Sequence, residues 1–190
     1  MTTYKAIHGK TVQTLASDPD NAAFEGQLWF NSTSGDFKTI TRVAGSWSTG
    51  GDLGTARYGL AGSGPNSAAI VFGGSGLSAK AETYDGASWT EVGDLNLARV
   101  GIVGADLGTQ TATLAFGGYV SPAEKNETEL WNGSSWTETA DLSTARGYGA
   151  GAGTSTAGIS FGGAIAPGPS ASTEEFTASG ANSTREFDLS

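Results

Sequence analysis

The sequence predicts an all-β chain assembled from repeated antiparallel units, and three observations support this prediction. The string Asp-Leu-x-x-Ala-Arg occurs three times and ends at Arg57, Arg99 and Arg146, so successive copies are 42 and 47 residues apart. Short apolar segments between the copies end in two glycines, and Asp-Gly or Asn-Gly pairs follow as tight hairpin turns. Charged residues make up only 15% of a chain rich in serine and threonine, which favours exposed strands over charged helices.

Each repeat is predicted to hold four strands in a fixed order. The first follows the arginine, the second ends at the diglycine, and a variable insert separates it from the third, in which an acidic residue precedes an aromatic one. The fourth strand begins at a tryptophan after the turn. The repeated tryptophans are Trp47, Trp89 and Trp136, and the diglycines are Gly73 and Gly74, Gly117 and Gly118, and Gly162 and Gly163. A period of about 40 to 50 residues with four short strands is typical of a β-propeller blade.

The repeated residue types have mechanical reasons. Two glycines at a strand end remove side-chain crowding where chains approach closely. One tryptophan per unit offers a large area for packing one twisted sheet on the next, and an arginine can fork onto a carboxylate or onto carbonyls between units. The last unit has Phe176 but no tryptophan after it, and we expect residues 184–189 to form its outer strand.

The order of arginine, diglycine strand, Tyr-Asp-Gly-like turn and tryptophan resembles the kelch repeat of β-propellers, from Trp47 to the end of the chain. The resemblance implies kelch-like four-stranded antiparallel blades: about three units, plus a partial one that the strands at residues 27–31 and 37–43 would supply. Kelch propellers usually have six or seven blades, so these units cannot close such a ring alone. We expect a partial or oligomer-completed propeller, with an open arrangement covered by partners or a compact four-blade ring as alternatives.

Three segments are predicted: an extended N-terminal arm at 1–25, a short β module at 26–50 and three kelch-like repeats at 51–190. The arm is mixed polar and apolar, and its strand at residues 2–13, with Tyr4, Ile7 and Val12 as anchor residues, could pair with another subunit. The module has the form Gly-x-x-Trp-aromatic-Asn-x-x-x-Gly from Gly26 to Gly35. This form resembles a module near the start of phage tail-fibre and appendage proteins, and its combination with kelch-like units resembles virion proteins of marine and cyanobacterial phages.

Composition excludes several classes of function. The net charge of −9 argues against nucleic acid or an anionic membrane as the main partner, and no apolar run approaches the roughly 18 residues of a membrane span. The chain has no cysteine and one histidine, His8, which excludes thiolate catalysis, Cys-ligated metals and imidazole-rich metal sites. Glu174 and Glu175 are adjacent on a strand and therefore point to opposite faces. We expect no enzyme activity and no cofactor; for Asp18, Asp20, Asn21 and Glu25, a capped turn is favoured over a calcium site.

Function is expected in what varies between repeats, because loops on a rigid scaffold commonly carry recognition. The inserts after the diglycines differ in length and chemistry, and their candidate recognition residues are Lys80, Tyr119, Pro122, Glu124, Lys125 and Asn126. The resemblance implies a virion structural protein in a tail or other surface appendage, whose arm docks on the particle and whose partners are copies of itself and other virion proteins. A sugar-binding propeller that contacts a host surface glycan is the alternative, and a polysaccharide depolymerase is a third hypothesis.

Overall fold

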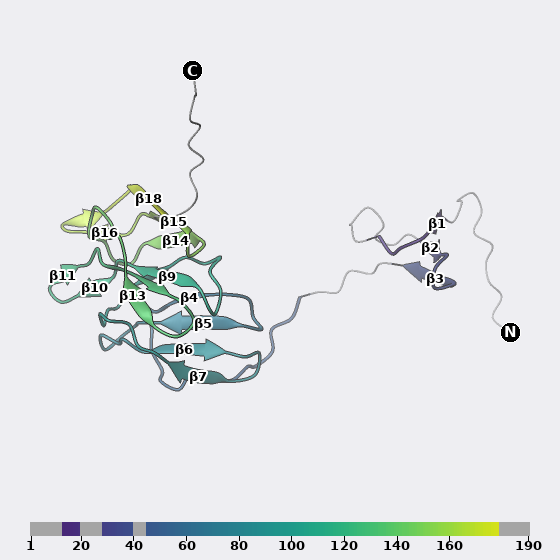
Figure 1. The fold of residues 1–190 in the computed structure, drawn as a ribbon, viewed down its shortest axis with the longest axis horizontal. Coiled ribbons are helices and arrows are strands. Elements are labelled where there is room, and N and C mark those ends of the chain that lie inside the picture. The colour runs from purple at the N-terminus through teal and green to yellow at the C-terminus, as the bar shows by residue number, and fades with distance from the viewer. Residues whose placement is uncertain (1–12, 20–27, 40–44, 179–190) are drawn as a thin grey trace, which may run out of the picture. The chain divides into compact units, whose positions relative to one another are not determined.

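The computed structural model describes residues 13–19, 28–39 and 45–178, and all regular structure within these residues is β-strand, as the sequence predicts. The chain divides into two compact units, Met1–Ser48 and Thr49–Ser190 (Figure 1). The division falls two residues before the boundary expected between the module and the repeats. None of the described residues belongs to a helix that could span a membrane.

In the N-terminal unit, three short strands form one sheet. They are β1 (Gln13–Leu15), β2 (Leu28–Asn31) and β3 (Asp36–Thr39). The hairpin β2–β3 turns tightly because Asn31 Oδ1 accepts hydrogen bonds from the backbone N–H groups of Thr33 and Ser34 and because Gly35 takes a φ of +76°. The predicted Trp-aromatic-Asn module is therefore a hairpin that the asparagine fixes.

The arm does not stand apart from this module in the residues that the structure describes. β1 pairs in parallel with β2 of the same chain, so the arm and the module share one sheet rather than separating at residue 25. Gln13, the end of the strand expected to pair with another subunit, thus pairs within its own chain. The anchor residues Tyr4, Ile7 and Val12 lie outside the described residues, as does the predicted outer strand at 184–189.

The C-terminal unit contains three antiparallel sheets, one for each predicted repeat (Figure 1). The first sheet is β4 (Ala61–Ser63), β5 (Ala69–Phe72), β6 (Ala81–Tyr84) and β7 (Trp89–Val92). The second is β8 (Val103–Gly104), β9 (Thr113–Phe116), β12 (Thr128–Trp131) and β13 (Trp136–Glu138). The third is β14 (Ala150–Gly153), β15 (Ala157–Phe161) and β18 (Thr173–Thr177). Within the described residues, the predicted four strands are therefore complete in two sheets and number three in the last.

Two of the variable inserts form small hairpins outside these sheets. They are β10 (Tyr119–Val120) with β11 (Ala123–Glu124), and β16 (Ala164–Ile165) with β17 (Gly168–Pro169). Each begins directly after a diglycine whose two residues have positive φ. Glycine adopts this backbone conformation without the steric cost that other residues have, so the diglycine turns the chain out of the sheet and into the hairpin.

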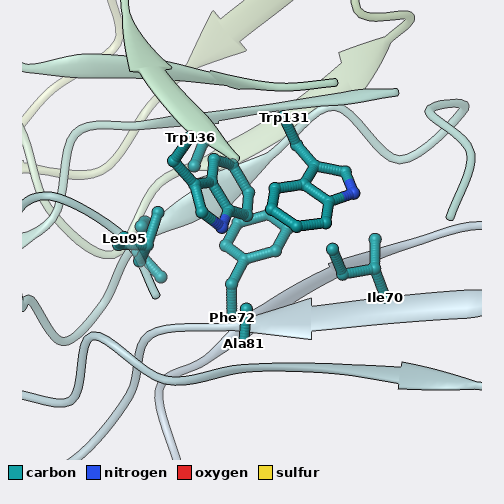
Figure 2. Packing of buried hydrophobic residues seen from close by; sticks show 8 residues of the cluster. Ile70, Phe72, Ala81, Leu95, Trp131 and Trp136 are labelled. Atoms are coloured by element: carbon teal, nitrogen blue, oxygen red, sulfur yellow. The ribbon is translucent and has the colours of Figure 1, made fainter. Parts of the chain in front are cut away.

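The core lies between neighbouring sheets. The first and second sheets enclose a cluster that contains Ile70, Phe72, Leu95, Trp131 and Trp136. Figure 2 shows the Phe72 ring pointing toward the two indoles, and its centroid lies 4.9 Å from that of Trp136 at an interplanar angle of 66°. This edge-to-face geometry is favoured by the quadrupoles of aromatic rings, so the tryptophan of one repeat packs on the diglycine strand of the previous one.

Alternation along the diglycine strands sets which side chain faces which sheet. Ile70 and Phe72 of β5 point toward the second sheet, whereas Ala115 of β9 points back toward the first. Leu114 and Phe116, on the opposite side of β9, belong to a second cluster against which Phe176 of the third sheet packs. Each sheet thus has a forward face, defined by the side of Phe72 or its counterpart Phe116, and a back face.

Glycines on the innermost strands allow the sheets to approach closely. A Cβ on Gly104 would lie 3.1 Å from Phe72 Cζ, and a Cβ on Gly151 would lie 2.6 Å from both Phe116 Cζ and the Gly104 carbonyl oxygen. Both residues occupy the position five residues after the repeated arginine. They form notches, one per sheet, in which the forward-facing phenylalanine of the preceding sheet is seated.

Trp47 does not have the packing role that its spacing predicts. It lies outside any strand and its side chain is fully exposed. Trp89 and Trp136 each begin the outer strand of a sheet, whereas residues 45–50 contain no strand. The repeats in the C-terminal unit therefore begin after Trp47, with Arg57.

Candidate functional site

A buried arginine and a glutamate meet in every repeat of the C-terminal unit. The three pairs are Arg57 with Glu82 at 2.9 Å, Arg99 with Glu129 at 2.9 Å, and Arg146 with Glu174 at 2.6 Å. The arginine precedes the innermost strand of a sheet, and the glutamate is the second residue of its third strand. In the second and third sheets the arginine forks onto a carboxylate and carbonyls of its own repeat, whereas the sequence predicted such a contact between units.

Arg99 shows in detail how such an arginine is held. Its Nη1 donates to the carbonyl oxygens of Gly117, at 3.0 Å, and of Glu127, and its Nη2 donates to Glu129 Oε1. Burial lowers the pKa of Arg99, and the nearby carboxylates of Glu129, Glu127 and Asp141 oppose this effect. A paired, hydrogen-bonded guanidinium remains charged in such a setting, so Arg99 joins three groups of the second sheet as a buried cation.

Glu174 is held by donors from the segment that leads into its sheet. Its Oε2 accepts from the backbone N–H and the hydroxyl of Ser143, at 2.6 and 2.7 Å, and its Oε1 accepts from Arg146 and from the Thr144 N–H. Partial burial favours the protonated form, but the hydrogen bonds from Ser143 and Arg146 outweigh it and lower the pKa of Glu174. As predicted from strand geometry, Glu174 points inward, whereas Glu175 is exposed.

The two tryptophans in phase bind equivalent backbone groups. Trp89 Nε1 donates to the Gly51 carbonyl at 3.1 Å, and Trp136 Nε1 donates to the Gly93 carbonyl at 3.0 Å. Gly51 and Gly93 both precede the Asp-Leu pair of the repeat. Each indole therefore ties the outer strand of a sheet to the segment that enters the same sheet.

One end of the C-terminal unit, where the diglycines and the inserts lie, is the candidate recognition surface; we call it the diglycine end. Backbone hydrogen bonds connect the sheets here, from Gly101 N to the Gly59 carbonyl and from Tyr148 N to the Gly101 carbonyl, each 2.8 Å long. Gly74 N and Gly118 N donate in the same way to the carbonyls of the next repeated arginine, Arg99 and Arg146. These cross-links hold the loops of successive sheets in fixed relation.

Tyrosines are exposed at the diglycine end. Tyr58 has 76% and Tyr148 has 58% of its surface exposed. Tyr148 adopts a φ of +56° at the position where the other two repeats have Gly59 and Gly101, and its ring lies over Gly101. A tyrosine in this left-handed region is strained, and sequence reasoning did not find it as a candidate.

The six predicted recognition residues divide into two groups. Tyr119, Pro122 and Glu124 lie on the β10–β11 hairpin, with Tyr119 joined to Val100 by two backbone hydrogen bonds. The other three are engaged elsewhere.

Those three residues make contacts within the fold. Lys80 forms an ion pair with Glu91 at 2.5 Å. Lys125 N donates to the Gly118 carbonyl, and Asn126 Nδ2 donates to the Leu142 carbonyl at 3.2 Å. The Asn126 side chain therefore bonds the segment that leads into the third sheet, whereas Lys125 is joined to Gly118 through its backbone.

The glutamates of the buried pairs were not selected from the sequence, although their signal was present. Each stands at the start of the acidic-aromatic strand, in Glu-Thr-Tyr, Glu-Leu-Trp and Glu-Glu-Phe. Their recurrence in phase with the arginines, rather than any single motif, identifies the pairing.

A pocket of about 170 Å³ lies between the second and third sheets. Phe116, Ala140, Leu142, Glu174 and Phe176 are among the residues that line it. Phe116 and Ala140 are in phase with Phe72 and Gly93, the residues that Trp136 contacts one repeat earlier. The pocket thus lies at a packing position of the repeat. Three carboxylates line it, of which Glu174 is bound to Arg146 and Asp141 accepts a hydrogen bond from the Thr128 N–H, while Glu175 is exposed.

No group of three or more acidic or histidine side chains that could hold a metal ion occurs among the residues described. Asp18, the first residue of the calcium candidate, accepts from Asn31 Nδ2 at 2.6 Å and pairs with Lys38 Nζ at 2.8 Å. These bonds, the one from Lys38 above all, lower the pKa of Asp18. The other three members of that candidate lie outside the described residues.

Comparison with known proteins identifies a fold and no family. No family model matches the chain, and no curated protein matches it in sequence. Among solved structures, the chain is similar to one titled "Structure of YjhT", with a TM-score of 0.55 and 12% sequence identity. The match covers 79% of this chain and 48% of that one, so this chain spans about half the length of that protein. At this identity the likeness shows the fold alone.

Proposed function

We propose that the three sheets of the C-terminal unit are kelch-like propeller blades and that the chain is a non-enzymatic structural protein of a phage particle. The observation that carries this proposal is the use of the buried charges. Arg57, Arg99 and Arg146, each more than nine-tenths buried, pair with glutamates of the same scaffold. Because the buried arginines pair within the scaffold and recur in each repeat, they stabilise a rigid structure, and a virion component needs such rigidity.

The two compact units support a division of labour. The N-terminal unit has its own fixed hairpin and its own clamp, in which Asp18 holds Asn31 and Lys38. The C-terminal unit presents loops on a rigid stack of sheets, the usual arrangement for recognition. We assign attachment to the particle to the N-terminal unit and outward contacts to the C-terminal unit.

Labelling of particles tests this function. Antibodies against the purified chain are applied to gradient-purified particles from lysed cultures of cells that carry the gene, and the label is located by electron microscopy. Label confined to one kind of tail or surface appendage is expected. Recovery of the whole chain in the soluble fraction, with none on particles, would overturn the proposal.

A matched pair of variants then tests attachment. Asp18→Ala removes the clamp of the N-terminal unit, whereas Asp36→Ala removes an exposed carboxylate from the same hairpin with no hydrogen bond or ion pair to lose among the described residues. Asp18→Ala should lower the amount of chain on particles, and Asp36→Ala should not. Equal incorporation of both variants would assign attachment elsewhere.

A second candidate function, binding of a host glycan, is favoured by the exposed tyrosines of the diglycine end. Sugar rings stack on aromatic faces, and Tyr58 and Tyr148 present such faces beside the hairpin that carries Tyr119 and Glu124. Binding of the purified chain to host polysaccharide is expected, and Tyr119→Ala or Tyr58→Ala should reduce it. A glycan array without a hit would remove this candidate and leave the structural role standing.

A further inference from the structure

Within the three-sheet stack, the forward face of one sheet packs on the back face of the next. The forward face of the third sheet and the back face of the first sheet carry the two sides of this contact but have no neighbouring sheet among the described residues. Phe72 and Phe116 face forward and have 0% and 3% of their surface exposed, because the next sheet covers them. Phe161 occupies the same position in the third sheet, two residues after Ile159, yet it has 41% of its surface exposed. The forward face of the third sheet therefore offers the knob that the other two sheets bury.

The back face of the first sheet offers the matching socket. Trp131 and Trp136, whose centroids lie 5.3 Å apart, receive Phe72 on the back of the second sheet. Tyr84 and Trp89 stand in phase with them on the first sheet, with centroids 4.9 Å apart. An aromatic pair of similar geometry thus lies on a face that no sheet of the described chain covers.

The glycine notch recurs at this socket. Gly104 and Gly151 seat Phe72 and Phe116, respectively. Gly62 stands at the same point of the first repeat, five residues after Arg57, and it is exposed. A Cβ on Gly62 would meet only atoms of its own sheet, at 3.1 Å or more, so the notch is open to a side chain from outside.

The side chain beside the notch is also less buried in the first sheet than in the other two. Val71 is in phase with Ala115 and Ser160, which point back toward a preceding sheet and have 0% and 2% of their surface exposed. Val71 is only partly buried. This position is thus covered by a preceding sheet in the second and third sheets, and it is only partly covered in the first sheet.

Backbone groups complete the match. Gly74 N donates to the Arg99 carbonyl, and Gly118 N donates to the Arg146 carbonyl, both across a sheet boundary. The next donor in this series is Gly163 N on the third sheet, and the first acceptor in it is the Arg57 carbonyl on the first sheet. These two groups have the same relation as the two pairs that bond within the chain.

We propose that the partner of both faces is a second copy of this chain, bound head to tail, with Phe161 of one copy seated in the Gly62 notch beside Tyr84 and Trp89 of the other. A head-to-tail contact either closes a ring or grows a filament. Two copies bring six sheets, which lies within the range of roughly four to eight blades that propellers use. The assembly is therefore a two-copy ring. This closure rests on the proposal that the sheets are propeller blades and does not depend on whether the chain belongs to a particle.

The experiment measures the mass of the full chain in solution at micromolar concentration by light scattering or native mass spectrometry. Twice the 19.1 kDa of one chain is expected. Phe161→Glu places a charge on the forward face, and Val71→Lys places one on the back face. Both side chains are at least partly exposed in one chain, so both variants should fold and give monomers. Leu107→Glu, at an exposed apolar residue off both faces, should leave the dimer intact.

Mixing the two variants identifies the direction of assembly. A mixture of Phe161→Glu and Val71→Lys chains retains one unaltered knob and one unaltered socket, so mixed dimers are expected although each variant alone is monomeric. If Val71→Lys alone still dimerises while Phe161→Glu does not, the Phe161 faces meet each other and the proposal is wrong. If the unaltered chain is a monomer in solution, the proposal is wrong as well, because Phe161 then needs no second copy to cover it.

Discussion

Arg99 Nη2 lies 2.9 Å from Glu129 Oε1, and both side chains are almost completely buried. The same carboxylate accepts hydrogen bonds from the backbone N–H groups of Asn96 and Leu97. The segment that leads from the first sheet is therefore fastened to the third strand of the second sheet by one arginine and one glutamate. Altering this pair therefore tests how much the contact contributes to the stability of the joined repeats.

Replacing Arg99 by lysine should destabilise the C-terminal unit by about 3 kcal/mol, because a buried pair that loses its geometry costs several kcal/mol and lysine lacks the guanidinium fork. Arg57→Lys is the matched control: Arg57 lies 2.9 Å from Glu82, but its guanidinium makes no hydrogen bond among the described residues. The smaller loss is expected there. Urea unfolding followed by circular dichroism measures both, and equal losses would contradict a special role for the Arg99 hydrogen bonds.

Glu174 should make stability depend on pH in the acid range. Its pKa in the folded chain is lowered, so between that value and the ordinary value of 4.5 the unfolded chain binds more protons. The contribution is therefore fully present above about pH 4.5 and is lost as the pH falls through the folded pKa. The free energy of unfolding is measured by urea unfolding at several pH values. Glu174→Gln should make it depend less on pH below about 4.5. Glu175→Gln, at an exposed residue with no ion pair among the described residues, should leave this dependence unchanged.

Repetition explains how much of this molecule was predictable. The arginine, the diglycine and the tryptophan recur in order, and packing positions recur because every sheet meets its neighbour in the same way. Positions without repetition were harder to assign. Lys125 and Asn126 occur in one insert only, and nothing local to them distinguishes a side chain that reaches a ligand from one that bonds the backbone, as Asn126 Nδ2 does at the Leu142 carbonyl.

Trp47 and Tyr148 show why other assignments failed. Spacing placed Trp47 in the repeat, but a tryptophan packs only where its own strand joins a sheet, and residues 45–50 form none. Tyr148 stands where two repeats have glycine, and a positive φ at a tyrosine depends on the hydrogen bond to Gly101 and on neighbouring loops. Neither feature is encoded in a local sequence pattern.

The Gly151 notch should not tolerate a methyl group. An alanine Cβ there would lie 2.6 Å from Phe116 Cζ and from a backbone oxygen, and overpacking a close contact costs about 1 to 3 kcal/mol. Gly168→Ala is the control, because nothing lies within 4 Å of its Cβ position and its φ is not positive. Thermal unfolding should separate the two variants, and an unchanged unfolding temperature for Gly151→Ala would show that the second and third sheets are less closely packed than these distances require.

Trp136→Phe should destabilise the chain by about 1 to 2 kcal/mol, since it removes the hydrogen bond to the Gly93 carbonyl and part of a buried ring. The chain offers its own control in Trp47, which is fully exposed. Trp47→Phe should leave the unfolding midpoint unchanged. A loss at Trp47 as large as that at Trp136 would mean that Trp47 belongs to the packed repeat after all.

Tyr148 allows strain and recognition to be separated. In the left-handed region any residue with a Cβ is less stable than glycine by about 1 to 2 kcal/mol, and the two equivalent positions are Gly59 and Gly101. Tyr148→Gly should therefore be more stable than Tyr148→Ala by about 1 kcal/mol in urea unfolding, against the usual cost of glycine. Both variants remove the exposed ring, so both should lose any glycan binding of the diglycine end. If the alanine variant is the more stable one, the backbone at Tyr148 is not strained. The tyrosine then carries no loss of stability that a role in recognition would have to explain.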